Sequence, residues 1–308
     1  MAENIKIYNF MGLRKLALIL SAAMLIASIA SLAVNGLRFG LDFTGGSLVE
    51  VAYQSDADLS SIRDKLHDAG FEDAVVQTFG SANDVLIRLG ADHDPKLGDK
   101  VLTALQQGEE QTVELRRNEF VGSQVGEELR EQGGLGLLLA LFMIMVYVAF
   151  RFQFKFSLGA VMALAHDVII TLGFFSIFKL EFDLTVLAGV LAVIGYSLND
   201  TIVVFDRIRE NFRKVRKGEP PEIINISLTQ TLARTLMTSL TTLLVLVALA
   251  VFGGEMIRGF SMALLVGITV GTYSSIYVAA NLLVMLGISK EDLMPPPKED
   301  PEAMDEVP

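Results

Sequence analysis

The sequence contains no cysteine and no tryptophan, and only three of its 308 residues are histidine. Without cysteine there is no disulfide framework and no thiolate ligand or nucleophile. The three histidines, His67, His93 and His166, are scattered, and no phosphate loop or G-x-S-x-G element accompanies them. A conventional enzyme, and an ATPase in particular, is therefore not expected, and neither a metal nor another cofactor is predicted.

Charge is missing from long stretches of a chain that is 52% hydrophobic, which is typical of an integral membrane protein. The first uncharged run, residues 16–34, follows Lys6, Arg14 and Lys15. It is longer than the core of a signal peptide and further apolar runs follow it, so we interpret it as an uncleaved membrane helix. Five more runs are long enough to span a bilayer: 133–150, 156–178, 182–205, 232–254 and 259–286.

These runs predict an α-helical membrane protein with six transmembrane helices and one small α+β domain between the first and the second. The expected divisions are an N-terminal stub with the first helix at 1–34, the α+β domain at 35–132, five helices at 133–288 and an acidic tail at 289–308. The tail is predicted to be disordered, because its prolines cannot continue a helix and its acids repel one another.

The distribution of Lys and Arg predicts the orientation in the membrane. Bases gather in the N-terminal stub, after the second span and after the fourth span, whereas the opposite short links carry only Lys179 and Arg258. Positive loops face the cytoplasm, so both termini are expected there and residues 35–132 outside. The bases thus indicate topology, and no nucleic-acid partner is predicted.

The 35–132 segment holds 19 acidic and 9 basic residues and has the pattern of alternating strands and helices. Strand and helix periodicities predict the order β-α-β-β-α-β of the ferredoxin-like split unit, with Gly80 to Asn83 as the hairpin link. The predicted strands are 47–54, 74–79, 85–89 and 112–121, and the predicted helices are 59–69 and 96–107.

A glycine pair, Gly45 and Gly46, follows Asp42 where the chain leaves the first span. One interpretation is a tight turn into the first strand, since glycine marks special backbone geometry. The other is a contact site, and both interpretations stay open at this point.

Ionisable residues inside the apolar runs are the candidate functional groups. His166 and Asp167 lie in the third run, Asp200 in the fourth and Arg234 in the fifth. An Asp in hydrocarbon costs about 2.5–3.5 kcal/mol on insertion scales, so such residues typically mark an ion pathway or a proton relay. Asp200 and Arg234 are expected at the same depth, within reach of each other.

Small polar residues are expected to surround Asp200 in a pocket rather than leave it on a lipid face. They are Ser197, Asn199 and Thr201 of the fourth run, with His166 beside Asp167 in the third. Asp167 fits a packing role and a place in the relay equally well. The alternative for Asp200 and Arg234 is a structural ion pair that only fixes helix packing, which leaves the desolvation cost poorly explained.

Glycines in the spans predict close helix contacts, which allow two alternative packings of a helix pair. They are Gly189 and Gly195 in the fourth run and the Gly267-x-x-x-Gly271 spacing in the sixth. Protonation of Asp200 would remove its attraction to Arg234, and a helix pair with two packings could convert that change into movement.

The residues also carry a resemblance to a known family. Four stretches of the sequence strongly resemble the SecF family, whose members are the smaller subunit of the bacterial SecD–SecF export factor. They are LDFTGG at 41–46, LAHD at 164–167, VIGYSLNDTIVVFDRIREN at 193–211 and RTLMTSLTT at 234–242. The long motif of the fourth run is specific, whereas the glycine pair alone is weak.

The resemblance implies a multi-pass protein of the bacterial inner membrane in the resistance-nodulation-division superfamily. It implies pairing with SecD, association with the SecYEG translocon and use of the proton-motive force in late export of unfolded preproteins. YajC and YidC are further partners that it implies. Carried over by motif position, Asp200 and Arg234 would belong to the proton-transport site.

Two other classes of function remain open. The chain could be a scaffold that stabilises SecD or the translocon without moving protons. It could also be half of a small-solute proton antiporter of the same superfamily, although that reading predicts larger extracytoplasmic inserts.

Overall fold

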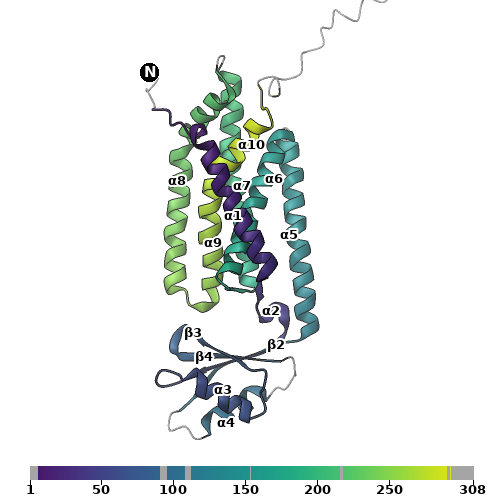
Figure 1. The fold of residues 1–308 in the computed structure, drawn as a ribbon, viewed down its shortest axis with the longest axis vertical. Coiled ribbons are helices and arrows are strands. Elements are labelled where there is room, and N and C mark those ends of the chain that lie inside the picture. The colour runs from purple at the N-terminus through teal and green to yellow at the C-terminus, as the bar shows by residue number, and fades with distance from the viewer. Residues whose placement is uncertain are drawn as a thin grey trace, which may run out of the picture.

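The computed structural model describes residues 6–90, 96–107, 112–152, 154–215, 218–289 and 292. A helical bundle is joined at one end to a small sheet domain, and the described N-terminal and C-terminal residues lie at the other end (Figure 1). His93 and all of the predicted tail except Ser289 and Asp292 lie outside the described residues.

Six helical segments of the described chain are long and apolar enough to cross a membrane. The prediction of six spans is thereby confirmed. They are α1 (Arg14–Val34), α5 (Ser123–Arg151), α6 (Phe154–Ile177), α7 (Leu184–Lys214), α8 (Pro220–Phe252) and α9 (Glu255–Ser274), the last continued by a π-helical turn (Ser275–Ala279) and α10 (Ala280–Met285). A 3₁₀ turn (Met11–Leu13) precedes α1.

Several helices extend beyond the apolar runs from which they were predicted. Helix α5 begins at Ser123, inside the segment expected to belong to the α+β domain, and α7 continues to Lys214. Helix α8 begins at Pro220, where Glu219 and Glu222 form a capping box. Hydropathy marks only the part of a helix that suits hydrocarbon, so it misses the turns that continue into water.

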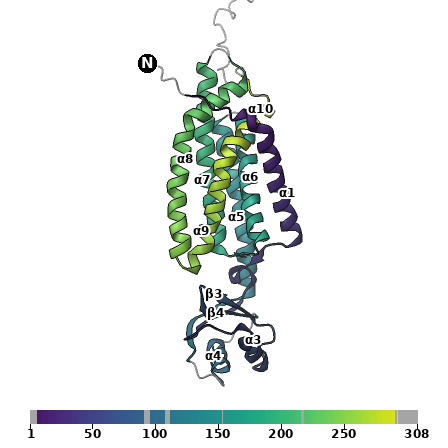
Figure 2. The ribbon, with the colours of Figure 1, turned by 60° about the vertical axis from the view of Figure 1, so that its left-hand side comes forward.

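Helices α6, α7 and α9 form the inside of the bundle, and α1, α5 and α8 lie at its rim (Figure 2). The rim helices leave large apolar side chains exposed, among them Leu138 and Phe142 of α5 and Leu244 of α8. Apolar side chains exposed over the length of three helices are unfavourable in water and suit a lipid or protein environment.

The sheet domain contains four antiparallel strands in the order β3-β4-β2-β5. They are β2 (Gly46–Ala52), β3 (Val75–Phe79), β4 (Ser81–Leu89) and β5 (Glu114–Val121), and helices α3 (Leu59–Asp68) and α4 (Leu97–Gln106) cover the face away from the bundle (Figure 1). Alternate residues such as Val49, Val51 and Ile87 pack against Leu66 and Leu105 of these helices. The ferredoxin-like assignment stays a prediction.

The hairpin link of the sheet is shorter than expected. Strand β4 already begins at Ser81, and Phe79 pairs with Ser81 across Gly80, whose φ is +77°. The prediction that residues 80 to 83 form the link is therefore wrong, because one glycine in the left-handed region reverses the chain by itself.

The sheet domain is tied to the bundle by backbone and side-chain contacts. Short strands β1 (Arg38–Phe39) and β6 (Glu181–Phe182) pair in parallel. Arg88 of β4 forms an ion pair with Glu181, and Arg38 donates to Gln77 Oε1 at 3.2 Å. The first residues after α1 and the link before α7 thus meet between the bundle and the sheet.

Candidate functional site: a buried polar cluster between helices

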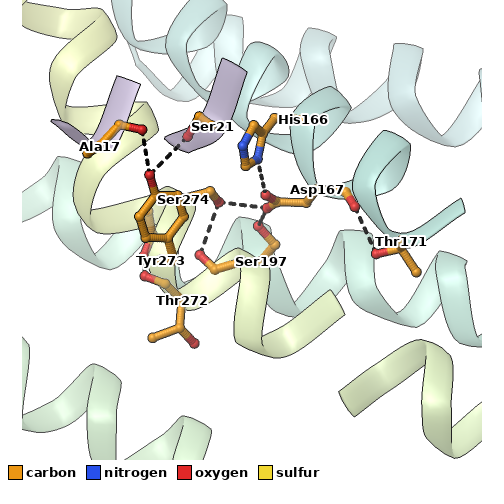
Figure 3. Close-up of polar contacts among 11 residues, drawn as sticks. Ala17, Ser21, His166, Asp167, Thr171, Ser197, Thr272, Tyr273 and Ser274 are labelled. Carbon is orange, nitrogen blue, oxygen red and sulfur yellow. Dashed lines mark hydrogen bonds and ion pairs between the residues drawn. The ribbon is translucent and has the colours of Figure 1, made fainter. Parts of the chain in front are cut away.

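Asp167 of α6 is the centre of the polar contacts inside the bundle. Its side chain is 0% exposed. Asp167 Oδ2 accepts hydrogen bonds from Ser197 Oγ of α7 at 2.5 Å and Ser274 Oγ of α9 at 2.7 Å, while Oδ1 lies 2.9 Å from His166 Nδ1 (Figure 3). One carboxylate therefore connects the three inner helices.

Glycines bring α9 close enough for these contacts. A Cβ at Gly271 would lie 3.0 Å from Ser197 Cβ and 3.5 Å from Asp167 Oδ2, and a Cβ at Gly267 would overlap the side chain of Val193. Gly189 likewise faces Ala263, with 3.0 Å between a Cβ there and Ala263 Cβ. The prediction of close contacts is confirmed for these three glycines but is wrong for Gly195, which faces open space.

The outer helix α1 is connected to this cluster through Tyr273 of α9. The Tyr273 hydroxyl donates to the Ala17 carbonyl at 2.7 Å and lies 3.0 Å from Ser21 Oγ (Figure 3). The Tyr273 ring also lies 6.4 Å from the His166 ring, centroid to centroid. The π-helical turn begins two residues later, and such turns are frequent at functional sites.

Asp200 is buried separately, one helical turn beyond Ser197 on α7. It is 3% exposed, and its Oδ2 has no hydrogen-bond partner within the described chain. Ser239 and Arg234 of α8 are the groups that act on this carboxylate, the first through its hydroxyl and the second through its charge.

Arg234 itself lies on the exposed side of α8. Among the described residues no ion pair within 4.0 Å joins it to Asp200. The direct pair that the sequence suggests is thus replaced by a longer-range interaction, because the helical position of Arg234 turns its side chain outward.

The predicted polar surround divides into three parts. Ser197 and His166 contact Asp167 rather than Asp200. Thr201 is fully buried next to Asp200 with no hydrogen-bond partner for Oγ1 in the described chain, and Asn199 is exposed.

Sequence reasoning missed the hydroxyl groups of α8 and α9. Thr231, Thr235 and Ser239 recur every four residues and form one buried stripe of α8, and Ser239 Oγ lies 2.7 Å from Thr272 Oγ1 of α9. Hydroxyl residues at helical spacing within an apolar run are the signal that would have found this face. Ser274 lies among Thr269, Thr272 and Ser275 of the same run, so its hydroxyl could have been noticed, but its contact with Asp167 depends on the packing of α9 on α6.

The glycine pair forms a junction of tightly packed backbone. Gly45 and Gly46 have φ of +68° and +122°, in the region that favours glycine. A Cβ at Gly45 would lie 2.6 Å from Ser123 Cα, at the start of α5. Asp42, in the short helix α2 (Leu41–Thr44), accepts a hydrogen bond from the Leu184 amide at the start of α7 at 3.0 Å. This geometry matches the interpretation of a tight turn.

Comparisons with known families agree with this architecture. Residues 100–289 match the family described as protein export membrane protein SecD/SecF, C-terminal, and residues 30–57 match the SecD/SecF GG motif. The second match contains the glycine junction, and the first contains His166, Asp167, Asp200 and Arg234.

Curated relatives are similar over almost the whole chain. The protein translocase subunit SecF of Pseudomonas aeruginosa is 56% identical, with 96% of this chain and 98% of the relative covered. Its counterpart from Vibrio alginolyticus is 55% identical, with 98% of both chains covered. That of Escherichia coli O157:H7 is 47% identical, with 94% and 91% covered.

Solved structures show the same fold. SecDF of Thermus thermophilus, a translocon-associated membrane protein, is 36% identical with a TM-score of 0.84 over 93% of this chain. A SecDF structure in its super-membrane-facing form is 38% identical with a TM-score of 0.66 over 91% of the chain. The chain spans only 39% and 38% of those two SecDF chains. On these matches, the chain belongs to the SecF branch of the SecD/SecF family of protein export membrane proteins.

Proposed function

We propose that the chain is a non-enzymatic subunit of the protein translocase that couples proton flow through the membrane to late-stage export of preproteins. The observation that carries the proposal is Asp200, a carboxylate 3% exposed among apolar helices, with an oxygen that no described residue satisfies. Ionisable groups in such surroundings are costly and typically belong to ion pathways or proton relays.

The exposure of Arg234 supports pairing with SecD. An arginine on the outer face of a membrane helix is costly in hydrocarbon, by about 2.5–3.5 kcal/mol at the centre of a helix on insertion scales. Covering this face of α8 with helices of a second subunit would remove Arg234 from lipid. The chain matches only 39% of the SecDF chain, which leaves a large second part to supply such helices.

The family supports the remaining assignments. SecYEG and the unfolded preprotein are the further partners proposed, with YajC and YidC as additional contacts. The chain is placed in the bacterial inner membrane with both termini in the cytoplasm and the sheet domain in the periplasm. Arg207, Arg209 and Arg213, near the end of α7, lie on the side assigned to the cytoplasm.

Substitution of Asp200 and Arg234 tests the proton coupling. Asp200→Asn keeps the size and most hydrogen bonding of the side chain but removes its titration, and Arg234→Met removes the charge but keeps a long stem. Each is expected to abolish the part of preprotein export that requires a proton gradient. Export is measured in inverted membrane vesicles with and without an uncoupler, at equal amounts of the assembled complex.

The exposed acid Asp73 of the sheet domain offers a matched control, and Asp73→Asn is expected to export as the unmodified chain does. The double variant Asp200→Asn with Arg234→Met separates a relay from a structural pair. Recovery of gradient-dependent export in the double variant would show that only charge balance matters, and it would contradict the proposal that Asp200 relays protons. Unchanged gradient-dependent export in Asp200→Asn would contradict the proton coupling and favour the alternative in which the chain is a scaffold.

A further inference from the structure

His166 and Asp167 form a buried dyad that the proposed role of Asp200 does not use. His166 is 4% exposed and Asp167 is 0% exposed, and the two are joined by the contact between Nδ1 and Oδ1 at 2.9 Å. Because an ionised carboxylate can only accept, Nδ1 carries the proton in this state. Nε2 is then a buried acceptor, and it has no partner in the described chain.

Hydrogen bonds stabilise the carboxylate of the dyad, and no Lys or Arg of the described residues forms an ion pair with it. Its described contacts are with His166, which is neutral in this state, and with Ser197 and Ser274, which supply its two hydroxyl donors. A buried carboxylate without a cationic partner needs such donors to offset its desolvation free energy. That free-energy cost falls when the carboxylate takes up a proton.

The elements packed around the dyad contribute few other titratable groups. Helix α9 contributes Tyr273, and α7 contributes Asp200, one turn beyond Ser197. Ala17 and Ser21 of α1, which contact the Tyr273 hydroxyl, do not titrate (Figure 3). Helix α5 supplies apolar residues such as Leu141. A proton that reaches this layer therefore finds His166 Nε2 as a basic atom without a competing hydrogen bond in the described chain.

We propose that His166 and Asp167 are a second protonation site of the pathway, in which His166 receives the proton and Asp167 stores it. This rests on the proposed function of Asp200. A proton binds Nε2 while the Nδ1 proton passes to Asp167 Oδ1. The histidine is again neutral, as its other tautomer, and the carboxylate has become a carboxylic acid. One proton has been gained, and no other charge has moved.

Storage of the proton changes the contacts between the inner helices. Hydrogen bonds to an ionised acceptor are roughly twice as strong as those between neutral groups. Loss of the Asp167 charge therefore weakens the contacts from Ser197 and Ser274 together. Ser274 directly precedes the π-helical turn at Ser275–Ala279, where the backbone hydrogen-bond register already changes. The protonated dyad thus loosens α9 at the point where a register shift is easiest.

Infrared difference spectroscopy tests the storage step directly. The full-length chain, assembled with its partner in lipid bilayers, is titrated with acid while the carbonyl stretch of carboxylic acids is followed. Among the carboxylic-acid bands that appear on acidification, one is expected to be lost in Asp167→Asn. His166→Asn places an amide donor near the Nδ1 position but cannot exchange protons at a ring, so the band is expected to titrate at a different pH.

The exposed neighbours His67 and Asp68, with side chains 69% and 88% exposed, provide the matched control. His67→Asn is expected to leave the Asp167 band and its midpoint unchanged. A titration that Asp167→Asn does not alter would overturn the proposal, and so would a midpoint that is the same in His166→Asn. This readout does not involve export, so it stands apart from the test of Asp200.

A second measurement places the dyad in the pathway. Gradient-dependent export is measured at several pH values on the side from which protons enter. His166→Asn is expected to displace the pH profile, whereas a purely structural role would lower export equally at every pH. A uniform loss would overturn the assignment of His166 as the receiving group, even if Asp200 proves essential.

Discussion

Asp42 shows how one residue of the glycine junction acts on a membrane helix. Its Oδ2 accepts from the Leu184 amide, while Asp183 Oδ1 accepts from the Val186 amide at 2.8 Å. Two of the unsatisfied amides at the start of α7 are thus paired with carboxylates, which also suit the positive end of the helix.

Removing the first of these carboxylates should destabilise the protein. Loss of a capping side chain costs about 1 kcal/mol, so Asp42→Ala is expected to lower the midpoint of thermal unfolding in lipid or detergent. Asp42→Asn retains an oxygen acceptor and should lose less. Equal midpoints in Asp42→Ala and the unmodified chain would show that Asp183 alone caps the helix.

Single residues also show where prediction from the sequence ends. Asp167 and Asp200 stand out because an acid within an apolar run has a cost that needs a reason. The outward position of Arg234 could not be predicted, since it depends on the rotation of α8 about its axis. That rotation is set by packing of the buried stripe of Thr231, Thr235 and Ser239 against neighbouring helices.

At the scale of helices, α7 and α9 depend on small residues for their close approach. Gly267→Ala would place a methyl group inside the van der Waals radius of the buried Val193 side chain. Overpacking of this kind typically costs about 1–3 kcal/mol, so a lower unfolding midpoint is expected.

Gly195→Ala is the matched control in the facing helix, because no atom lies within 4 Å of the added methyl group. Alanine is favoured over glycine in a helix by up to about 1 kcal/mol, so this variant should be neutral or slightly stabilising. Similar midpoints for the two variants would mean that α7 and α9 separate at no cost, against the close packing described.

The number and order of the membrane helices were predictable because hydrocarbon requires long apolar runs. The helix ends were not, because capping at Glu219 and the continuation of α7 into charged residues follow from local hydrogen bonding. The early start of α5 has a further cause. Its first residue, Ser123, packs on Gly45 from a distant part of the chain, and hydropathy cannot detect such a contact.

For the molecule as a whole, the orientation in the membrane stays a prediction that single cysteines can test. The chain has no cysteine, so one introduced residue is the only thiol. Ile7, which is 54% exposed, belongs to the N-terminal residues before α1, and Ser81, also exposed, begins β4. The N-terminus and β4 lie at opposite ends of the molecule (Figure 1). An impermeant thiol reagent added to intact spheroplasts should label Ser81→Cys and spare Ile7→Cys.

Labelling after lysis serves as the control, since both variants should then react. The reverse pattern in intact spheroplasts would place the sheet domain in the cytoplasm and contradict the positive-inside assignment. Labelling of both variants before lysis would indicate leaky membranes and call for repetition with a sealed preparation.

Helix α7 connects the glycine junction to the buried acids without a break. Its first amide rests on Asp42, and Asp200 lies 16 residues further along the same helix, about 24 Å at 1.5 Å per residue. A continuous helix resists compression along its axis, so a displacement at one end is transmitted to the other end. A shift of Ser197 along the helix axis would therefore displace Asp42 by almost the same distance. The sheet domain, which follows Asp42 in the chain, would move with it.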